Sequence, residues 1–288
     1  MKKGFVLLAS FFSILAGYSA EWRLVWSDEF DKPGRPDPAK WGYEQGFVRN
    51  REAQWYQPEN CYCSNGWLVL EGRKERRPNP RYRPDVPKAN WYASRKEIEY
   101  TSGCVVTKGK LSWRYGRFEI KAKITAEGGL WPAIWFVGAR ERPMPLDRWP
   151  ACGEVDLMEY YDHSILANLC WAQCGSDSKR VWSKWNTKKM PMARFTKKDP
   201  LWAEKWHVWR MDWDEKWIRL FIDGELVNEQ ELALCRNPGG VGHRYPFQEK
   251  MHLLINLALG GTGGKSLKKT HFPSYFLIDY VRVYQRAP

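Results

Sequence analysis

Three carboxylates lie close together in the segment GEVDLMEYY (residues 153–161), whose other side chains favour a buried β-strand. Aspartate and glutamate are poor strand residues and are costly to bury, so the three acids need a reason to be there. Alternate side chains of a strand share a face, which puts Glu154 and Asp156 together and Glu159 one residue out of phase. A one-residue bulge near Leu157 or Met158 would bring Glu159 onto the same face.

Three acids on one face suit the hydrolysis of a glycosidic bond. A retaining glycosidase uses two carboxyls about 5 to 5.5 Å apart, one that attacks the anomeric carbon and one that protonates the leaving oxygen. The central Asp156 could orient the nucleophile, while repulsion and desolvation would raise the pKa of whichever carboxyl starts protonated. The alternative, surface acids on an edge strand, is less favoured because Val155, Leu157 and Met158 imply burial on at least one side.

The surrounding chain predicts the β-strands that would position these acids. Apolar and charged residues alternate in GRFEIKAKI (116–124), as in a half-exposed antiparallel strand. Residues 218–227 predict a hairpin that turns at Asp223-Gly224, and FLIDYVRVYQ (276–285) predicts one more strand. No helix-period stretch exceeds about ten residues, so the sequence predicts an all-β sandwich. The Pro- and Arg-rich segment 73–91 suits a loop at the edge of a cleft.

The chain has 18 tryptophans, more than a core of this size needs, since each buried indole N–H must find a partner. We therefore expect many of them to be partly exposed. Flat aromatic faces that line a groove can hold sugar rings, whose C–H faces are apolar. Packing in the core and anchoring of loops are the alternative for any single tryptophan.

The first residues, MKKGFVLLASFFSILAGYSAEW, contain two lysines, an apolar run and then small residues, the layout of a secretory signal peptide. We expect residues 1–19 to be this leader, with cleavage after Ser19 favoured over cleavage after Ala20, and residues 20–288 to form a single domain. No later segment approaches the roughly 18 apolar residues of a membrane span. We expect an exported protein, periplasmic, at the cell surface or extracellular.

The formal net charge of +13 favours acidic partners. In an exported chain we expect solvated basic loops and no nucleic-acid partner, and a sulfated or sialylated glycan stays open. The seven cysteines lack metal-type spacing, and we expect most to be small buried residues, although export would permit disulfides. We expect a monomer that needs no cofactor or metal; a calcium ion, if bound, would be structural, and nothing in the sequence indicates one.

Several segments, in order along the chain, resemble glycoside hydrolase family 16, in the laminarinase-like, agarase-like and carrageenase-like branches with a Glu-x-Asp-x-x-Glu strand. They cover nearly all of the chain after the leader. The segments are WSDEF (26–30), NREAQWY (50–56), YTSGCVVTKGKLSWRYGRFEIKAKI (100–124), GGLWPAIWFVG (128–138), WPACGEVDLMEYY (149–161), WHVWRMDWDEKWIRLFIDGE (206–225), INLALGG (255–261) and LIDYVRVYQ (277–285).

This resemblance implies a β-jelly roll sandwich, like concanavalin A, whose concave sheet forms an open cleft, and an endo-acting enzyme that retains configuration. It implies that Glu154 is the nucleophile, Glu159 the general acid and then base, and Asp156 the assisting acid. Trp131 and Trp149 match positions that stack sugars on the non-reducing side, and Asn50 matches a substrate contact; structural packing is the alternative for these three. For His207, a satisfied core histidine is favoured over a catalytic one.

The chain departs from the family pattern at three positions. Cys104 replaces the arginine of a common Ser-Gly-Arg, Cys170 replaces a histidine near the acid/base in many relatives, and Glu249 stands where glutamine is common. We expect these changes to affect the cleft lining, which puts a plain β-1,3-glucan substrate in doubt.

Two classes of substrate therefore stay open for an endo-β-glycosidase that hydrolyses O-glycosyl bonds. One is β-1,3 or mixed-linkage glucan. The other is a β-galactan-like chain such as the poly-N-acetyllactosamine of mucin-type O-glycans. A non-catalytic lectin would explain the tryptophans but not the three acids, and a structural exported protein would explain neither.

Overall fold

The computed structural model describes residues 21–141, 144–174 and 181–286. The predicted leader, residues 1–19, lies outside the described residues. Within them the chain forms two β-sheets with short helical turns, which confirms the predicted all-β jelly roll. No helix in the described part of the chain has the length and apolar character needed to cross a bilayer.

The larger sheet, which we call the outer sheet, has the strand order β15-β14-β13-β8-β17-β5-β6-β3, with β1 added on β17 and β4 on β5. Its strands are β1 (Trp22–Asp28), β3 (Gln54–Tyr56), β4 (Cys61–Ser64), β5 (Trp67–Pro78), β6 (Glu97–Ser102), β8 (Gly116–Lys123), β13 (His207–Trp213), β14 (Trp217–Ile222), β15 (Glu225–Glu231) and β17 (Ser274–Arg286).

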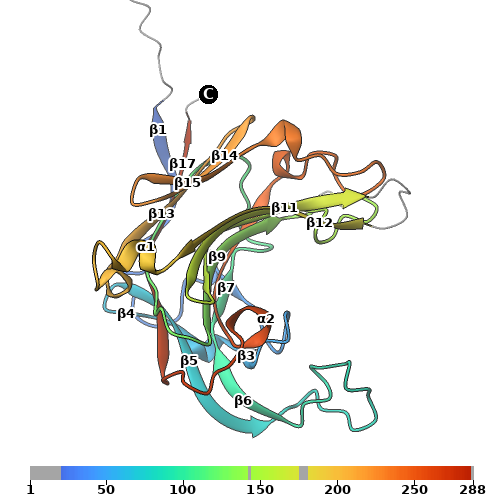
Figure 1. Cartoon of the computed structure of the whole chain (residues 1–288), viewed down its shortest axis with the longest axis vertical. Helices are drawn as coiled ribbons and strands as arrows, with labels where there is room; N and C mark the ends of the chain where they lie inside the picture. Colours follow the sequence, from blue (N-terminus) through green and yellow to red (C-terminus); the bar gives the residue numbers. More distant parts are fainter. Residues whose placement is uncertain (1–20, 142–143, 175–180, 287–288) are drawn as a thin grey trace, which may run out of the picture.

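The smaller sheet, which we call the inner sheet, has the order β12-β11-β10-β9-β16-β7-β2. Its strands are β2 (Gly42–Tyr43), β7 (Cys104–Val106), β9 (Leu130–Gly138), β10 (Glu154–Tyr161), β11 (Ser164–Cys174), β12 (Val181–Pro191) and β16 (Met251–Leu259). The helical turns are η1 (Pro58–Asn60), α1 (Ala193–Thr196), η2 (Trp202–Glu204), η3 (Leu232–Leu234), η4 (Pro246–Gln248) and α2 (Gly261–Gly264). Figure 1 shows how strongly strands β9 and β11 of this sheet curve.

The main core lies between the two sheets. On β8 the predicted alternation holds, since Phe118 and Ile120 are fully buried while Arg117 and Glu119 face outward. Phe118 meets Phe136 of the inner sheet with ring centroids 5.0 Å apart. This contact between the sheets is the kind of apolar burial that stabilises a sandwich.

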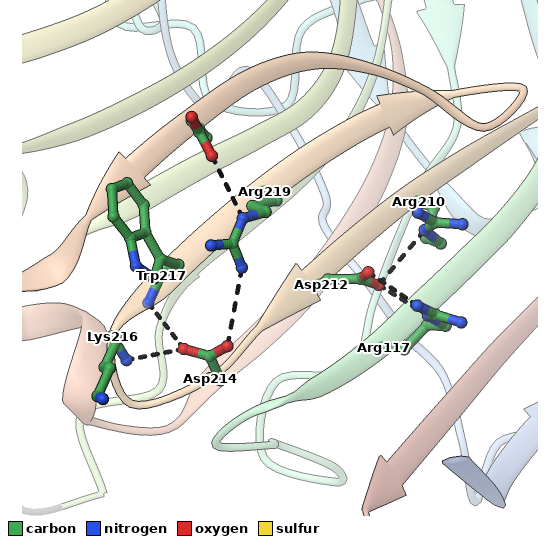
Figure 2. Close-up of polar contacts among 8 residues, drawn as sticks. Arg117, Arg210, Asp212, Asp214, Lys216, Trp217 and Arg219 are labelled. Atoms are coloured by element: carbon green, nitrogen blue, oxygen red, sulfur yellow. Dashed lines mark hydrogen bonds and ion pairs between the residues drawn. The ribbon is translucent and has the colours of Figure 1, made fainter. Parts of the chain in front are cut away.

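Charged residues on the outer face of the outer sheet are paired with one another. Arg117 on β8 donates two hydrogen bonds to Asp212 on β13, at 2.7 and 2.8 Å, and Arg210 lies 3.4 Å from the same carboxylate. Figure 2 shows this group beside a second one, in which Asp214 accepts from the backbone amides of Lys216 and Trp217.

The tryptophans divide as their number predicts. Six of the 18 are buried, and the others are at least partly exposed; the buried ones are Trp41, Trp113, Trp171, Trp202, Trp209 and Trp213. Trp149 and Trp185 are among the most exposed, at 51% and 42%, and both belong to the region of the inner sheet described below.

The basic excursion is partly strand, which corrects the predicted loop 73–91. Strand β5 continues to Pro78 because it pairs with β6 as a ribbon, with Arg73 opposite Thr101 and Pro78 opposite Glu97. The connection that follows packs on the segment before β3, where Arg95 donates to the backbone oxygen of Glu52 at 2.7 Å.

Candidate active site

Strand β10, in the middle of the inner sheet, carries the predicted bulge. Asp156 pairs with Trp135 on β9 and Met158 with Ile134, so β10 holds one extra residue at Leu157. The pairing with β11 shifts in the same place, between Asp156 and Glu159. An extra residue reverses the side-chain alternation that follows it, and this puts Glu159 on the same face as the two earlier acids.

The three acids line a single open cleft of about 1310 Å³ on the concave face of the inner sheet. The three predicted substrate-binding residues, Asn50, Trp131 and Trp149, line the same cleft. Asp156 is buried at the floor, with 3% of its surface exposed, and the other two acids are partly exposed. The structure thus brings all six predicted site residues together.

Asp156 and Glu159 form one hydrogen-bonded group. The amide nitrogen of Asn168 on β11 donates to Asp156 Oδ2 and to Glu159 Oε2, both at 3.0 Å. Trp131 Nε1 donates to Glu159 Oε1 at 2.8 Å. The two carboxyls are also in hydrogen-bonding contact with each other, which requires a proton between them. Asp156 therefore contacts the expected acid/base and interacts with Glu154 only through charge.

All three carboxyls have pKa values above their usual range. Burial, and then the charge of Glu159, raises the pKa of Glu154 to about 8, while Arg49 and the Trp149 indole oppose that rise. Burial, followed by the charge of Glu154 for Asp156 and of Asp156 for Glu159, raises the pKa of those two carboxyls well above their usual range. Burial and the charge of Asp156 therefore favour the protonated form of Glu159, while Arg49 and Trp149 favour the charged form of Glu154.

The stretch NREAQWY is fixed by its own polar residues. Glu52 accepts from the Asn50 amide at 3.3 Å and from the Gln54 amide at 2.6 Å, and Gln54 Oε1 accepts from the backbone of Leu259 on β16 at 2.8 Å. Asn50 has a positive φ of 55°, which asparagine tolerates better than most residues. This network attaches the Asn50 segment to the cleft edge.

The two predicted tryptophans lie at different ends of the acidic group. Trp131 on β9 contacts Glu159, and its ring packs against Tyr161 with centroids 5.2 Å apart. Trp149, in the β9–β10 connection, lies beside Glu154, and its ring is 6.4 Å from that of Trp185 on β12. They form two separate aromatic surfaces of one cleft.

Sequence reasoning missed Asn168, Arg49, Trp135 and Trp185, which all line the cleft. Asn168 is a polar residue in the otherwise apolar run of β11, and that contrast was a usable signal. Trp135 had a weaker signal: it is four residues from Trp131 on the same strand, and side chains at that spacing share a face. Trp185 lies in the basic stretch 179–198, which looks like a solvated loop, and Arg49 lies just before the NREAQWY stretch without a signal of its own.

The three departures from the family pattern lie outside the cleft lining, contrary to expectation. Cys104 is fully buried, and its thiol donates to Glu44 Oε2 at 3.2 Å. Cys170 is fully buried and pairs with Glu154 rather than Glu159. Glu249 lines a neighbouring pocket of about 320 Å³. Any effect of these residues on substrate must therefore pass through the residues that contact them.

His207 is a satisfied core histidine, as favoured. It lies on β13 of the outer sheet and is 6% exposed. Its Nδ1 is 2.6 Å from Asp223 and its Nε2 is 2.7 Å from the backbone oxygen of Trp202, whose ring stacks on it at 3.8 Å. Both ring nitrogens have partners, and neither reaches the cleft.

The cysteines form no disulfide in this structure; six of the seven are buried and Cys174 is partly exposed. Within residues 21–141, 144–174 and 181–286, no three His, Cys, Asp or Glu side chains are grouped so that they could hold a metal ion.

A two-sheet sandwich whose concave face carries paired carboxyls between aromatic surfaces defines a polysaccharide-cleaving hydrolase. The model of glycosyl hydrolases family 16 matches residues 88–281, and the chain belongs to this family. A second model, that of the beta-glucan synthesis-associated proteins SKN1/KRE6/Sbg1, matches residues 10–150. The chain is thus an endo-acting β-glycoside hydrolase, and a lectin is not favoured.

The most similar proteins include glucan- and galactan-cleaving enzymes. The chain is 33% identical to a beta-glucanase of Rhodothermus marinus, over 92% of this chain and 85% of that one. It is 27% identical to a keratan-sulfate endo-1,4-beta-galactosidase of Sphingobacterium multivorum, covering 93% of this chain but 56% of the longer relative. Among solved structures, one from work on endo-acting O-glycanases with which human gut microbiota initiate mucin breakdown superposes with a TM-score of 0.76, at 32% identity over 92% and 91% of the two chains.

Proposed function

We propose that the protein is an exported, retaining endo-β-glycosidase that cleaves internal β-linkages by double displacement. The observation that carries this proposal is the bulge at Leu157, which places Glu154, Asp156 and Glu159 on one face of β10 at the floor of the cleft. The surroundings of the two outer acids support the roles, because the nucleophile must be charged and the general acid must be protonated at the start of the reaction. Arg49 and Trp149 favour the charged form of Glu154, and the charge of Asp156 favours the protonated form of Glu159.

In the first step, a carboxylate oxygen of Glu154 attacks the anomeric carbon while Glu159 gives its proton to the glycosidic oxygen, which leaves with the rest of the chain. A glycosyl ester on Glu154 results. In the second step, Glu159, now ionised, takes a proton from water, and the hydroxide attacks the same carbon and releases Glu154. Two inversions give net retention.

Asp156 supports the proton on Glu159, whereas Asn168 and Trp131 orient the Glu159 carboxyl. The two neutral donors fix the carboxyl in place, and the shared proton with Asp156 keeps a second negative charge away from it until the leaving group departs. This is a different assisting role from the one the sequence suggested, since Asp156 acts on the acid/base rather than on the nucleophile.

For the substrate, we propose a β-linked, galactose-containing glycan of the poly-N-acetyllactosamine or mucin O-glycan type. Support comes from the similarity to the O-glycanase structure and the keratan-sulfate endo-galactosidase. Cys104 adds to it, because no arginine side chain reaches the cleft from that position. The second candidate, a β-1,3 or mixed-linkage glucan, is favoured by the 33% identity to the Rhodothermus marinus beta-glucanase.

Export is part of the proposal and rests on the leader-like residues 1–19. It is tested by locating the full-length protein, tagged at its C-terminus, in cell fractions and culture medium. Retention of the protein in the cytoplasm with an intact N-terminus would refute it.

The substrate is tested by mass spectrometry of the oligosaccharides released from mucin O-glycans, keratan-type chains, laminarin and mixed-linkage glucan. Glu154→Gln serves as the inactive control. Products from the first two alone would support the O-glycan proposal, products from laminarin alone would replace it by the glucan alternative, and early ¹H NMR spectra of the cleaved ends would show whether the β-configuration is retained.

A further inference from the structure

Four cationic side chains line the cleft, namely Arg49, Lys108, Arg140 and Arg148. Arg49 differs from the others because it is held in place on two sides. Its guanidinium pairs with the carboxylate of Glu44 and lies 5.0 Å from the centre of the Trp135 ring, and only 24% of the side chain is exposed. A guanidinium fixed by a carboxylate and an aromatic face has little freedom to turn away.

Cys104 completes the anchor of Arg49. Glu44 receives Arg49 on Oε1 and the Cys104 thiol on Oε2, the latter at 3.2 Å, and its backbone N–H donates to the Cys104 backbone oxygen, also at 3.2 Å. Burial, and then the charge of Glu44, raises the pKa of Cys104 well above its usual range, so the thiol keeps its proton and remains a donor. The small Cys104 side chain leaves room for this pair.

The aromatic surface beneath Arg49 is equally fixed. Trp135 Nε1 donates to Asn256 Oδ1 at 2.7 Å, and the Asn256 amide donates to the Tyr56 hydroxyl at 3.1 Å. Trp135 pairs directly with Asp156 across β9 and β10. The Arg49 guanidinium, which lies on the Trp135 ring, is therefore placed over β9, the strand next to the one that carries the three acids.

Glu154 faces few other charges. The titratable groups around it are Asp156 and Glu159 on its own strand, Cys170 on β11, Cys152 in the β9–β10 connection, His252 on β16 and Arg49. Burial and the charge of Lys108 keep His252 neutral, with a pKa lowered to about 4, and the thiols keep their protons. Arg49 is the cation with the largest effect in favour of the charged form of Glu154.

We propose that Arg49 is a positioning residue of the active site, whose guanidinium, anchored by Glu44, Cys104 and Trp135, supplies a positive charge that favours the ionised, nucleophilic form of Glu154. The inference rests on the proposed function, because it takes Glu154 as the nucleophile. It also gives Cys104 a purpose, as a donor that fixes Glu44 and through it Arg49.

The test is a direct titration of Glu154 by ¹³C NMR in protein labelled at the glutamate side-chain carboxyls, with the Glu154 signal assigned by its loss in Glu154→Gln. In Arg49→Gln we expect the titration midpoint of Glu154 to rise by about one pH unit, the lower end of the effect of a nearby opposite charge. Arg49→Lys should restore most of the shift. If Arg49→Gln does not fold, Arg49→Met, which keeps an unbranched chain over Trp135, replaces it.

The matched control is Arg117→Gln, which also removes a guanidinium from a carboxylate and from a tryptophan ring, Trp22 at 4.9 Å, but on the outer sheet. It should leave the Glu154 midpoint unchanged. For Cys104, the serine variant keeps a donor to Glu44 and should behave as wild type, whereas Cys104→Val should move the midpoint in the same direction as Arg49→Gln, by less.

Kinetics separate positioning from a merely structural role. The acidic limb of the kcat/KM profile follows ionisation of the nucleophile, so Arg49→Gln should move that limb to higher pH and leave the alkaline limb, set by Glu159, in place. An unchanged Glu154 midpoint in both Arg49→Gln and Arg49→Met would overturn the inference. If the wild type cleaves no glycan, the proposed function fails, while the NMR midpoint still decides the role of Arg49.

Discussion

The acids of the inner sheet and those of the outer sheet have opposite surroundings. On the outer sheet Asp212 lies between Arg117 and Arg210, and Asp214 accepts two backbone amides and faces Arg219 at 3.9 Å (Figure 2). On β10, none of the three acids forms an ion pair with any described residue, and each has another of the three acids as a charged neighbour. Acids of the first kind stabilise a fold; acids of the second kind cost stability.

This difference shows how one sandwich divides its tasks. Partly exposed carboxylates with positive partners keep their charge and strengthen the sheet modestly. Carboxyls that are buried together without such partners have raised pKa values, which general acid catalysis needs and stability does not. Substitution of an acid on the inner sheet should therefore lower activity without lowering stability, and substitution of an acid on the outer sheet should lower stability without lowering activity.

The largest effect should follow removal of either catalytic carboxyl. Glu154→Gln and Glu159→Gln should each lower kcat by at least about 10⁴-fold, because one loses the nucleophile and the other the proton donor. Both should fold and unfold at a temperature equal to or above that of the wild type, since a buried like charge is removed. Full activity in either variant, measured on the substrate found by the product assay, would refute the catalytic roles.

The next effect should come from Asp156→Asn, with a loss of about 10² to 10⁴ in kcat, the scale of one acid–base contribution. An asparagine removes the charge that raises the pKa of Glu159, so the alkaline limb of the kcat profile should move to lower pH. If kcat falls by this amount but the acidic limb of the profile moves and the alkaline limb does not, Asp156 acts on Glu154, as the sequence suggested, and not on Glu159.

The sequence predicted much of this site because the signal was local. The phase conflict between Asp156 and Glu159 within one strand was enough to place the bulge, and alternation was enough to identify β8 as half buried. The contact of Asn168 with two acids could not be predicted in the same way. It depends on the register of β11 against β10, which is set by packing of the whole inner sheet and leaves little local trace.

Residues on connecting segments were the hardest to place. Arg49 lies next to the motif residue Asn50, but only the tertiary structure shows that it turns onto Trp135 and Glu44. Trp149 was predicted at the cleft, yet its separation from Trp131 depends on the path of the β9–β10 connection. Charge alone suggested solvated basic loops, because composition does not report which side chains are fixed.

A smaller effect, on stability alone, should follow Asp212→Asn. The variant weakens two charge-assisted contacts, with Arg117 and Arg210, on a partly exposed surface. We expect a loss of about 1 kcal/mol in the free energy of unfolding, measured with urea, and an unchanged kcat/KM. A clear loss of activity with unchanged stability would mean that the two sheets are not separable in the way proposed here.

The most diagnostic effect is the sign of the pH dependence of stability. The pKa of Glu154 in the folded protein, about 8, lies above the ordinary value of 4.5, so the folded state binds more protons than the unfolded one between these limits. Its contribution to stability is present below about pH 4.5 and is lost as the pH rises through the folded-state pKa. Glu29, the residue that follows β1 of the outer sheet, is the opposite case: the hydrogen bond from Arg282 lowers its pKa, so its contribution is lost as the pH falls.

Thermal unfolding of the wild type, Glu154→Gln and Glu29→Gln at pH 5 and at pH 8 tests this contrast. Glu154→Gln should gain stability over the wild type at pH 8 and gain little at pH 5, because glutamine cannot ionise. Glu29→Gln should lose stability at pH 8, and the loss should shrink toward acid. If Glu154→Gln were instead less stable than the wild type at pH 8, the ionised Glu154 would be a stabilising, paired group like the acids of the outer sheet, and the contrast between the two sheets would not hold.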